Sequence, residues 1–180
     1  MDNRPPIDGA FDLESYFPQA YQELKRMAFA QLRSEREGHT LNATGLVHEV
    51  YLKLARQEQQ QFESKGHFFH VAALAMRRIL VSYARQKKSE KRGGDQVRLT
   101  LENQEVAHLT TYEDILHLND ALTRYHSLSE RGAKIIEFWF FGGFKQAEIA
   151  KILEISEVTV RREWRLARNW LSIQLKDLTP

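Results

Sequence analysis

The sequence predicts an all-α protein made of two small helical domains joined by a linker, the second a four-helix domain with a helix-turn-helix. Three observations favour this fold class. Apolar residues recur at three- and four-residue spacing along most of the 180 residues. Proline and glycine, which interrupt helices, number only four and nine. Between 93 and 110 the periodicity is weak and the charge is mixed, which is typical of a linker.

The composition limits the class of protein. Hydrophobic residues make up 42% of the chain, which is enough for a packed core, and the formal net charge of +2 is nearly balanced. The absence of cysteine excludes disulfides, thiol nucleophiles and thiolate metal sites. No apolar run approaches the roughly 20 residues of a membrane span, and the N-terminus lacks the pattern of a signal peptide. We therefore expect a soluble, cytoplasmic protein with no membrane partner.

The N-terminal domain is predicted over 11–92, after a polar tail at 1–10. Its first helix begins at Phe11, and its second begins at about Thr44 after a charged break. Both helices carry apolar residues on one face, which favours packing against a common core.

A third helix is predicted over 67–86 and is apolar almost all round, so we expect it at the centre of the bundle. Its C-terminal end is strongly basic. Positive charge there interacts favourably with the helix dipole, which accounts for two or three of the basic residues. A cluster this dense indicates a phosphate-binding surface. The basic residues are Arg77, Arg78, Arg85, Lys87, Lys88, Lys91 and Arg92.

The C-terminal domain is predicted over 111–180. Two helices, at 112–125 and 130–141, precede the segment 145–168, which has the pattern of two short helices joined by a tight turn. Ser156 is placed to be the N-cap of the second of these helices.

The second helix of 145–168 divides into an apolar and a basic face. Val160, Trp164, Ala167 and Leu171 fall three or four residues apart and can pack inward. A helix-turn-helix needs this division, because one helix crosses the DNA backbone while the other offers basic and hydroxyl side chains to the major groove. A solvated basic face on an ordinary helical hairpin is the alternative. The outward side chains are Thr159, Arg161, Arg162, Arg165 and Arg168.

The order of these features resembles the extracytoplasmic-function sigma factors of bacteria, small RNA polymerase subunits that keep only the second and fourth sigma regions. The resemblance covers about Phe11 to Leu175 and is carried by three stretches. LVHEVYLK at 46–53 is similar to the LVQEVFLK-type run of the helix that binds the polymerase clamp. LSER at 128–131 is similar to the family's LPER. EIA at 148–150, followed by TVR at 159–161, is similar to its EIA…TVK signature.

The resemblance implies a sigma factor that brings core RNA polymerase, through its clamp and flap regions, to promoter DNA in duplex and melted form. It implies no active site and no cofactor. The residues implied for the upstream promoter element are Ser156, Thr159, Arg161, Arg162 and Arg165. Those implied for the downstream element are Phe62, Ser64, Lys65, Arg77, Arg78, Arg85, Lys87 and Lys88. Those implied for binding core polymerase are Leu46, His48, Glu49 and Lys53.

Aromatic residues near the loop before the third helix are candidates for stacking on an unpaired base, which contributes about 1–3 kcal/mol per base. The candidates are Phe62, His67 and Phe68. Phe68 and its neighbour Phe69 fit a place in the core equally well. The family usually has a tryptophan where this chain has Val71, so the resemblance supports the duplex contacts better than the contacts that melt the promoter.

A second departure lies before the clamp-binding helix, where typical members carry an acidic run of the DAED type. This chain has Asn42-Ala43-Thr44-Gly45, with no negative charge. One subgroup of the family is linked to serine/threonine kinases, and phosphorylation of Thr44 would add about −1.5 to −2 charge. The helix N-terminus would favour that charge. The alternative is that Thr44 is an N-cap, and Thr40 is the lesser phosphorylation candidate.

Two other functional interpretations remain open. A repressor or activator that binds DNA through 145–168 and dimerises or senses a ligand through its N-terminal domain predicts a stable homodimer in gel filtration. An interaction protein without a role on DNA predicts an unchanged DNA affinity after Arg161→Ala plus Arg165→Ala.

An enzyme is not expected from the residues. Gly93-Gly94 and Gly142-Gly143 lack the Lys-Ser/Thr companion of a phosphate-binding loop. His67 and His70 are the closest histidine pair at helical spacing, but the nearest carboxylate, Glu63, lies in the preceding loop. We therefore expect no metal site.

Overall fold

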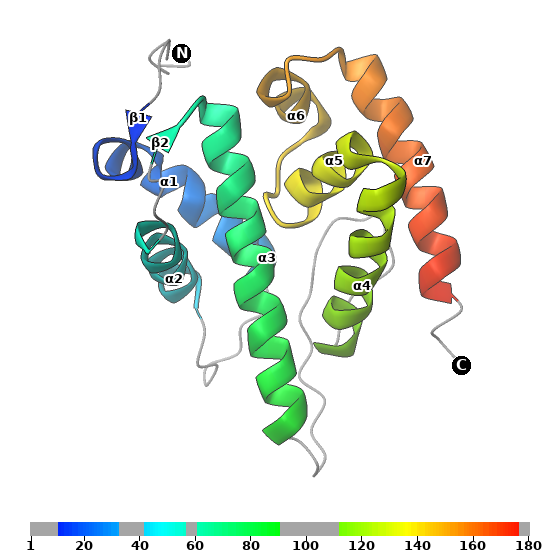
Figure 1. Cartoon of the computed structure of the whole chain (residues 1–180), viewed down its shortest axis with the longest axis horizontal. Helices are drawn as coiled ribbons and strands as arrows, with labels where there is room; N and C mark the ends of the chain where they lie inside the picture. The colour runs from blue at the N-terminus through cyan, green and yellow to red at the C-terminus, as the bar shows by residue number, and fades with distance from the viewer. Residues whose placement is uncertain (1–10, 33–41, 57–60, 91–111, 177–180) are drawn as a thin grey trace.

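Seven helices and one two-stranded sheet form the described part of the chain, which is residues 11–32, 42–56, 61–90 and 112–176 of a computed structural model (Figure 1). The all-α fold class is confirmed. The expected tail at 1–10, the whole of the expected linker at 93–110, Thr40, and the basic residues Lys91 and Arg92 lie outside the described residues. In chain order the helices are α1 (Leu13–Leu32), α2 (Ala43–Ala55), α3 (Lys65–Glu90), α4 (Tyr112–Leu128), α5 (Glu130–Phe140), α6 (Gln146–Ile152) and α7 (Glu157–Lys176).

A short antiparallel pairing joins the start of α1 to the segment before α3. Strand β1 (Phe11–Asp12) pairs with β2 (Gln61–Phe62), and Phe11 lies opposite Phe62. The first helix therefore begins two residues later than predicted, because Phe11 and Asp12 are extended. The carboxylate of Asp12 accepts a hydrogen bond from the backbone N–H of Ser15 at 2.8 Å, which caps α1.

The N-cap of α2 is Asn42, whose side-chain oxygen accepts a hydrogen bond from the backbone N–H of Gly45 at 2.8 Å. The alternative interpretation of Thr44 as the N-cap is therefore wrong. Thr44 lies in the first turn of α2 and is half-buried. The uncharged segment noted in the sequence therefore forms the N-cap and first turn of α2.

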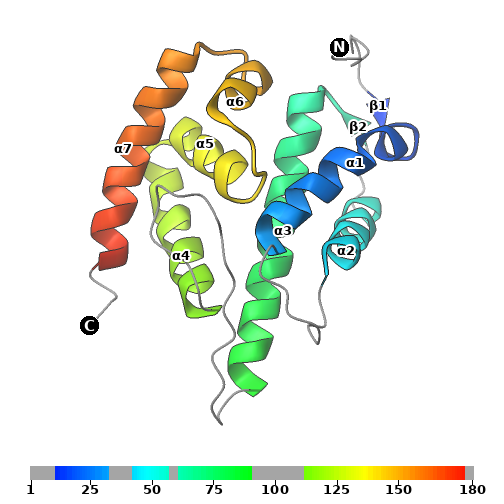
Figure 2. The same cartoon turned by 180° about the vertical axis from the view of Figure 1, so that it is seen from behind.

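Helix α3 lies at the centre of the molecule (Figures 1 and 2). We call residues 11–90 the N-terminal half and residues 112–176 the C-terminal half. One side of α3 packs on α1 and α2, and the other packs on α4 and α5. The prediction that this helix is central is confirmed, and its apolar residues on all sides are explained by two sets of neighbours.

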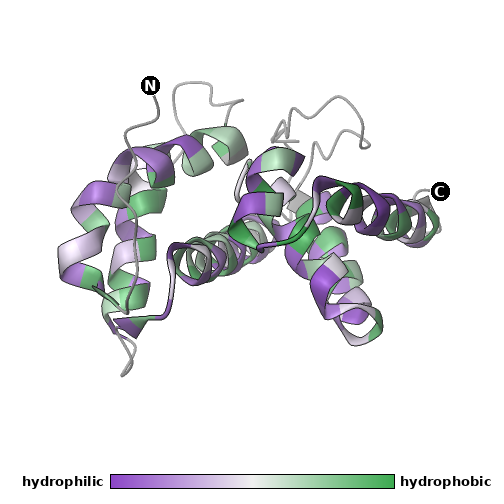
Figure 3. Ribbon diagram, turned by 90° about the horizontal axis from the view of Figure 1, so that it is seen from above, coloured by the Kyte–Doolittle hydropathy of each residue, from purple (hydrophilic) through white to green (hydrophobic). Residues whose placement is uncertain are grey.

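A single hydrophobic core extends through both halves. Buried residues of all seven described helices belong to it, and the ring of Phe69 on α3 packs edge-on against Phe144 at 5.7 Å between centroids. A smaller cluster of Val81, Ala84 and Ile115 joins α3 to α4. In the view from above, most helices show one apolar and one polar side, as amphipathic helices do (Figure 3). The two predicted domains thus pack closely on each other in this structure.

The helices that the structure describes were compared with the requirements for crossing a membrane. None of them combines the length and the hydropathy needed to span a bilayer.

Candidate nucleic-acid interface

The turn between α6 and α7 is a Schellman motif that gives the helix-turn-helix its sharp angle. The backbone N–H of Ile155 donates to the carbonyl of Ala150 at 3.0 Å, and that of Glu154 donates to the carbonyl of Lys151 at 3.4 Å. Glu154 has φ of 54°, the left-handed conformation that a glycine usually occupies at this position. The turn therefore forms without the glycine that would mark it in a sequence.

Ser156 immediately precedes α7, and its predicted N-cap role is confirmed. Its Oγ accepts a hydrogen bond from the backbone N–H of Thr159 at 3.1 Å and lies 2.9 Å from the Thr159 hydroxyl. Both hydroxyls are therefore held at the N-terminal end of α7, which is the end that a recognition helix presents to base edges.

The inner face of α7 packs as its spacing predicts. Val160, Trp164, Ala167 and Leu171 are buried. The ring of Trp164 lies 4.2 Å from that of Trp139 on α5, measured between centroids. This packing fixes the rotation of α7 about its axis, so the opposite face must point to solvent.

The outer face of α7 carries the predicted basic row. Arg161, Arg162 and Arg165 are exposed, and Thr159 is half-buried. Arg161 lies 3.8 Å from the carboxylate of Glu157, one turn earlier. Exposed pairs of this kind contribute only about 0–1 kcal/mol, so a DNA phosphate or base can replace the glutamate at little cost.

A buried carboxylate on α7, Glu163, fixes a further cation beside the basic row. Arg131 of the LSER segment donates to Glu163 Oε1 at 2.6 Å, and Arg162 approaches the same oxygen at 3.5 Å. The guanidinium of Arg131 remains half exposed. Sequence reasoning did not assign Arg131 to the interface, because its contact with α7 depends on how α5 packs. The match to LPER was the only signal that pointed to it.

The hydrogen bond from Arg131 lowers the pKa of Glu163 below its ordinary value of 4.5. A lowered pKa means that the ionised carboxylate stabilises the fold above pH 4.5, and that this contribution is lost as the pH falls through the folded pKa. We expect Glu163→Gln to lower the free energy of unfolding at neutral pH. Well below pH 4.5 the free energy of unfolding of the variant is expected to approach that of the wild type. Urea denaturation across this pH range measures the difference.

Glu157→Gln is the matched control, because Glu157 is an exposed carboxylate on the same helix. Its effect is expected to be small at every pH. If the loss of unfolding free energy in Glu163→Gln did not change with pH, the fold would depend on the shape of the Glu163 side chain and not on its ionisation.

The basic end of α3 is mostly exposed, as the phosphate-binding prediction requires. Arg78, Arg85 and Lys88 are exposed, and Lys87 is half-buried with its ammonium 5.7 Å from the centre of the Tyr83 ring. Lys88 lies 3.0 Å from the exposed carboxylate of Glu113 on α4.

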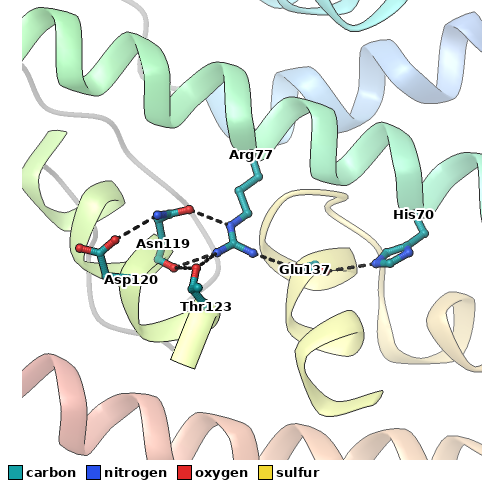
Figure 4. Close-up of polar contacts among 6 residues, drawn as sticks. All are labelled: His70, Arg77, Asn119, Asp120, Thr123 and Glu137. Atoms are coloured by element: carbon teal, nitrogen blue, oxygen red, sulfur yellow. Dashed lines mark hydrogen bonds and ion pairs between the residues drawn. The ribbon is translucent and has the colours of Figure 1, made fainter. Parts of the chain in front are cut away.

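Arg77 departs from that prediction, because its side chain is buried and points toward the C-terminal half (Figure 4). Its Nη1 donates to Glu137 Oε1 at 2.5 Å and its Nε donates to Asn119 Oδ1 at 3.1 Å. Its Nη2 donates to the Asn119 carbonyl at 2.8 Å and to the Thr123 hydroxyl at 3.1 Å. A guanidinium with these four bonds cannot hold a DNA phosphate in this conformation.

Phe62 and Phe68 also differ from the expected base-stacking role. Phe62 is buried, and its ring lies 5.0 Å from that of Phe68, between centroids. The alternative interpretation of Phe68 and Phe69 as core residues is the one that this structure shows. Ser64, just before α3, and His67 on α3 are exposed, and Lys65 is half-buried.

The outer face of α2 carries three of the four residues predicted to bind polymerase. His48, Glu49 and Lys53 are exposed, whereas Leu46 is fully buried in the core and cannot meet a partner. Leu52 is an exposed large apolar residue on the same face, which sequence reasoning missed. Its spacing of four from His48 was the signal that placed it there.

The structure gives no group of ligands for a metal ion among the described residues. His70, one of the two histidines considered for such a site, lies with its Nε2 3.1 Å from Glu137 Oε2.

A family model described as ECF sigma factor matches residues 10–177, which is nearly the whole chain. Comparison with curated proteins and with solved structures gives no match.

Proposed function

The chain belongs to the ECF sigma factor family, and from this premise we propose how its two halves divide the work of promoter recognition. As a sigma factor it directs RNA polymerase to promoters for the initiation of transcription, so polymerase and promoter DNA are its partners. We infer that α7 contacts the upstream promoter element in duplex DNA, while the exposed basic end of α3 contacts the downstream element.

The exposed arginine row of α7 is the observation that carries the proposal. Arg161 and Arg165 are one turn apart, and the packed face of Trp164 and Ala167 holds the row outward. The half-exposed Arg131, held by Glu163, supplies a cation beside the row. Arginines that reach base edges can form two hydrogen bonds to guanine, and those at the edge of the site contact phosphates.

We expect Arg161→Ala plus Arg165→Ala to weaken binding to the upstream element by about 1–3 kcal/mol for each base that an arginine no longer binds. A gel-shift titration of the reconstituted holoenzyme on promoter DNA, at one fixed salt concentration, measures this weakening. Arg161→Lys plus Arg165→Lys is the matched control, because it keeps both charges but cannot form the paired hydrogen bonds. Unchanged affinity in the alanine variant would remove α7 from the DNA interface.

We further propose that phosphorylation of Thr44 by a serine/threonine kinase strengthens binding to core polymerase. Typical members carry acidic residues at this position, whereas the first turn of α2 has none. The exposed residues His48, Glu49 and Lys53 follow on the outer face of the same helix. A phosphate on Thr44 would place negative charge at the start of that face, where the helix N-terminus stabilises it.

Promoter-specific transcription by reconstituted core polymerase tests the function and its regulation together. We expect Thr44→Glu and Thr44→Asp to initiate more efficiently than the unmodified protein, and Thr44→Ala to initiate no better than it. Phosphothreonine incorporated at position 44 gives the full charge, because a carboxylate supplies only one negative charge. Equal initiation by the phosphorylated and unmodified proteins would exclude the switch, and no initiation by either would count against the sigma-factor function itself.

A further inference from the structure

The interface between the two halves contains a polar cluster that we call the latch, made of His70, Arg77, Asn119, Thr123 and Glu137 (Figure 4). His70 and Arg77 lie on α3, whereas Asn119 and Thr123 lie on α4 and Glu137 lies on α5. Every hydrogen bond of Arg77 described above therefore crosses from the N-terminal half to the C-terminal half.

Glu137 is the acceptor at the centre of the latch, and its side chain is only 3% exposed. One of its oxygens accepts from Arg77 and the other lies within hydrogen-bond distance of His70. Both partners belong to the N-terminal half. A buried ion pair adds little net stability but requires its partners to meet in one arrangement, because an unpaired buried charge is costly. The latch therefore specifies one relative position of the halves.

Two glycines show how closely the halves approach at the edges of the interface. A Cβ atom on Gly66 would lie 2.6 Å from the carbonyl oxygen of Ile152, and one on Gly143 would lie 2.8 Å from the Cβ of Ala30. Arg26 on α1 also donates to the carbonyl of Gly143 at 3.0 Å. The chain of one half lies directly against the other at these points, so a side chain at either glycine would force a shift at the interface.

We propose that this closed arrangement is an autoinhibited state and that Arg77 is its release point. The proposal rests on the proposed function, in which the two halves hold separate promoter elements. Arg77 lies one residue before the exposed Arg78 in the basic series of α3. Its guanidinium has two mutually exclusive acceptors, the carboxylate of Glu137 when the halves are closed and a DNA phosphate when they are open.

Closure does not hide the recognition helix. Arg161, Arg162 and Arg165 are exposed while the latch is formed. The closed protein is therefore able to meet upstream duplex DNA, and what closure withholds is the placement of the two halves on two elements at once.

The cysteine-free chain allows a direct test of opening. Gln22 on α1 and Lys151 on α6 both line a cleft of about 490 Å³ between the halves. Gln22→Cys and Lys151→Cys, each carrying a spin label, report the separation by pulsed electron paramagnetic resonance. We expect one short distance in the free protein and a longer one with core polymerase and promoter DNA. A long or broad distribution in the free protein would overturn the closed state.

Two further substitutions in the labelled protein identify the interactions that keep it closed. Gly66→Val, which inserts bulk against Ile152, is expected to shift the free protein to the longer distance. Glu137→Gln removes the negative charge of the latch. We expect it to shift part of the free protein to the longer distance. Ser82→Val, at an exposed position of α3, is the matched control and is expected to leave the short distance unchanged. An unchanged short distance in both interface variants would overturn the assignment of the latch.

A cleavable bis-maleimide across the same two cysteines tests whether closure inhibits. We expect crosslinking to lower promoter-specific initiation by roughly tenfold or more, and cleavage of the linker to restore it. Each single-cysteine variant treated with the reagent controls for modification itself. Undiminished initiation by the crosslinked protein would overturn autoinhibition. Failure of the uncrosslinked protein to initiate would instead count against the proposed function, while the spin-label distances would still report the latch.

Discussion

Replacing Phe68 by alanine is expected to lower the free energy of unfolding by about 3–5 kcal/mol. Phe68 is 0% exposed, and its ring packs with those of Phe11, Tyr16, Phe62 and Phe69 at centroid distances of 6.3, 5.0, 5.0 and 5.3 Å. Removing the ring loses this burial and leaves a cavity that the neighbouring aromatic residues cannot close fully. Native domains are stable by only about 5–15 kcal/mol, so the loss is a large fraction of the total.

Urea denaturation followed by circular dichroism measures this change. His67→Ala is the matched control, since His67 precedes Phe68 on α3 but is exposed, and its substitution is expected to change stability by about 0.5 kcal/mol or less. The experiment also separates the two roles considered for Phe68. A variant with nearly wild-type stability and a specific defect in promoter melting would favour base stacking over the core role.

Removing one partner of the Arg77–Glu137 pair is expected to lower the free energy of unfolding by about as much as Phe68→Ala does. Arg77→Ala leaves the carboxylate of Glu137 facing the buried interface without its guanidinium, and breaking a buried pair in this way typically costs about 3–5 kcal/mol. The same substitution takes away the donor that Asn119 and Thr123 accept from. The penalty is expected to be smaller where the halves separate and water reaches Glu137.

Replacing both partners tests the physical cause. Arg77→Met combined with Glu137→Leu leaves no unpaired charge, so we expect the double variant to be close to wild type or more stable. The two single variants and the double variant form a double-mutant cycle, read out as free energies of unfolding in urea. Additive effects of the two single substitutions would show that the charges of Arg77 and Glu137 are not coupled in solution.

The helices could be predicted from the sequence, because helical periodicity and capping are local properties. The apolar spacing of Val160, Trp164 and Ala167 predicts the buried face of α7, and Ser156 predicts where that helix begins. The β1–β2 pairing was missed, because strands of two residues are too short to show an alternating pattern.

The errors at Arg77 and Leu46 have a common cause, which is that a functional motif does not state which face of a helix each residue occupies. Arg77 belongs to a basic run, but its spacing from the buried residues Ala73, Leu80 and Ala84 places it on the apolar face of α3. Leu46 lies in the stretch that resembles a polymerase-binding helix, yet it is a core residue. Helical spacing predicts an inward position for Leu46, in conflict with the polymerase-binding role that the motif suggests. The same spacing would have predicted that Arg77 is buried.

What the sequence determined by itself is the fold class, the helix-turn-helix with its basic face and, through its motifs, the family. These follow from patterns within one helix or between neighbouring helices. What only the tertiary structure decided is the partner of each charged side chain: Arg131 with Glu163, and Arg77 with Glu137 sixty residues away. A pairing at that separation depends on how α3, α4 and α5 pack together, so it cannot be predicted from the positions of the two residues in the sequence.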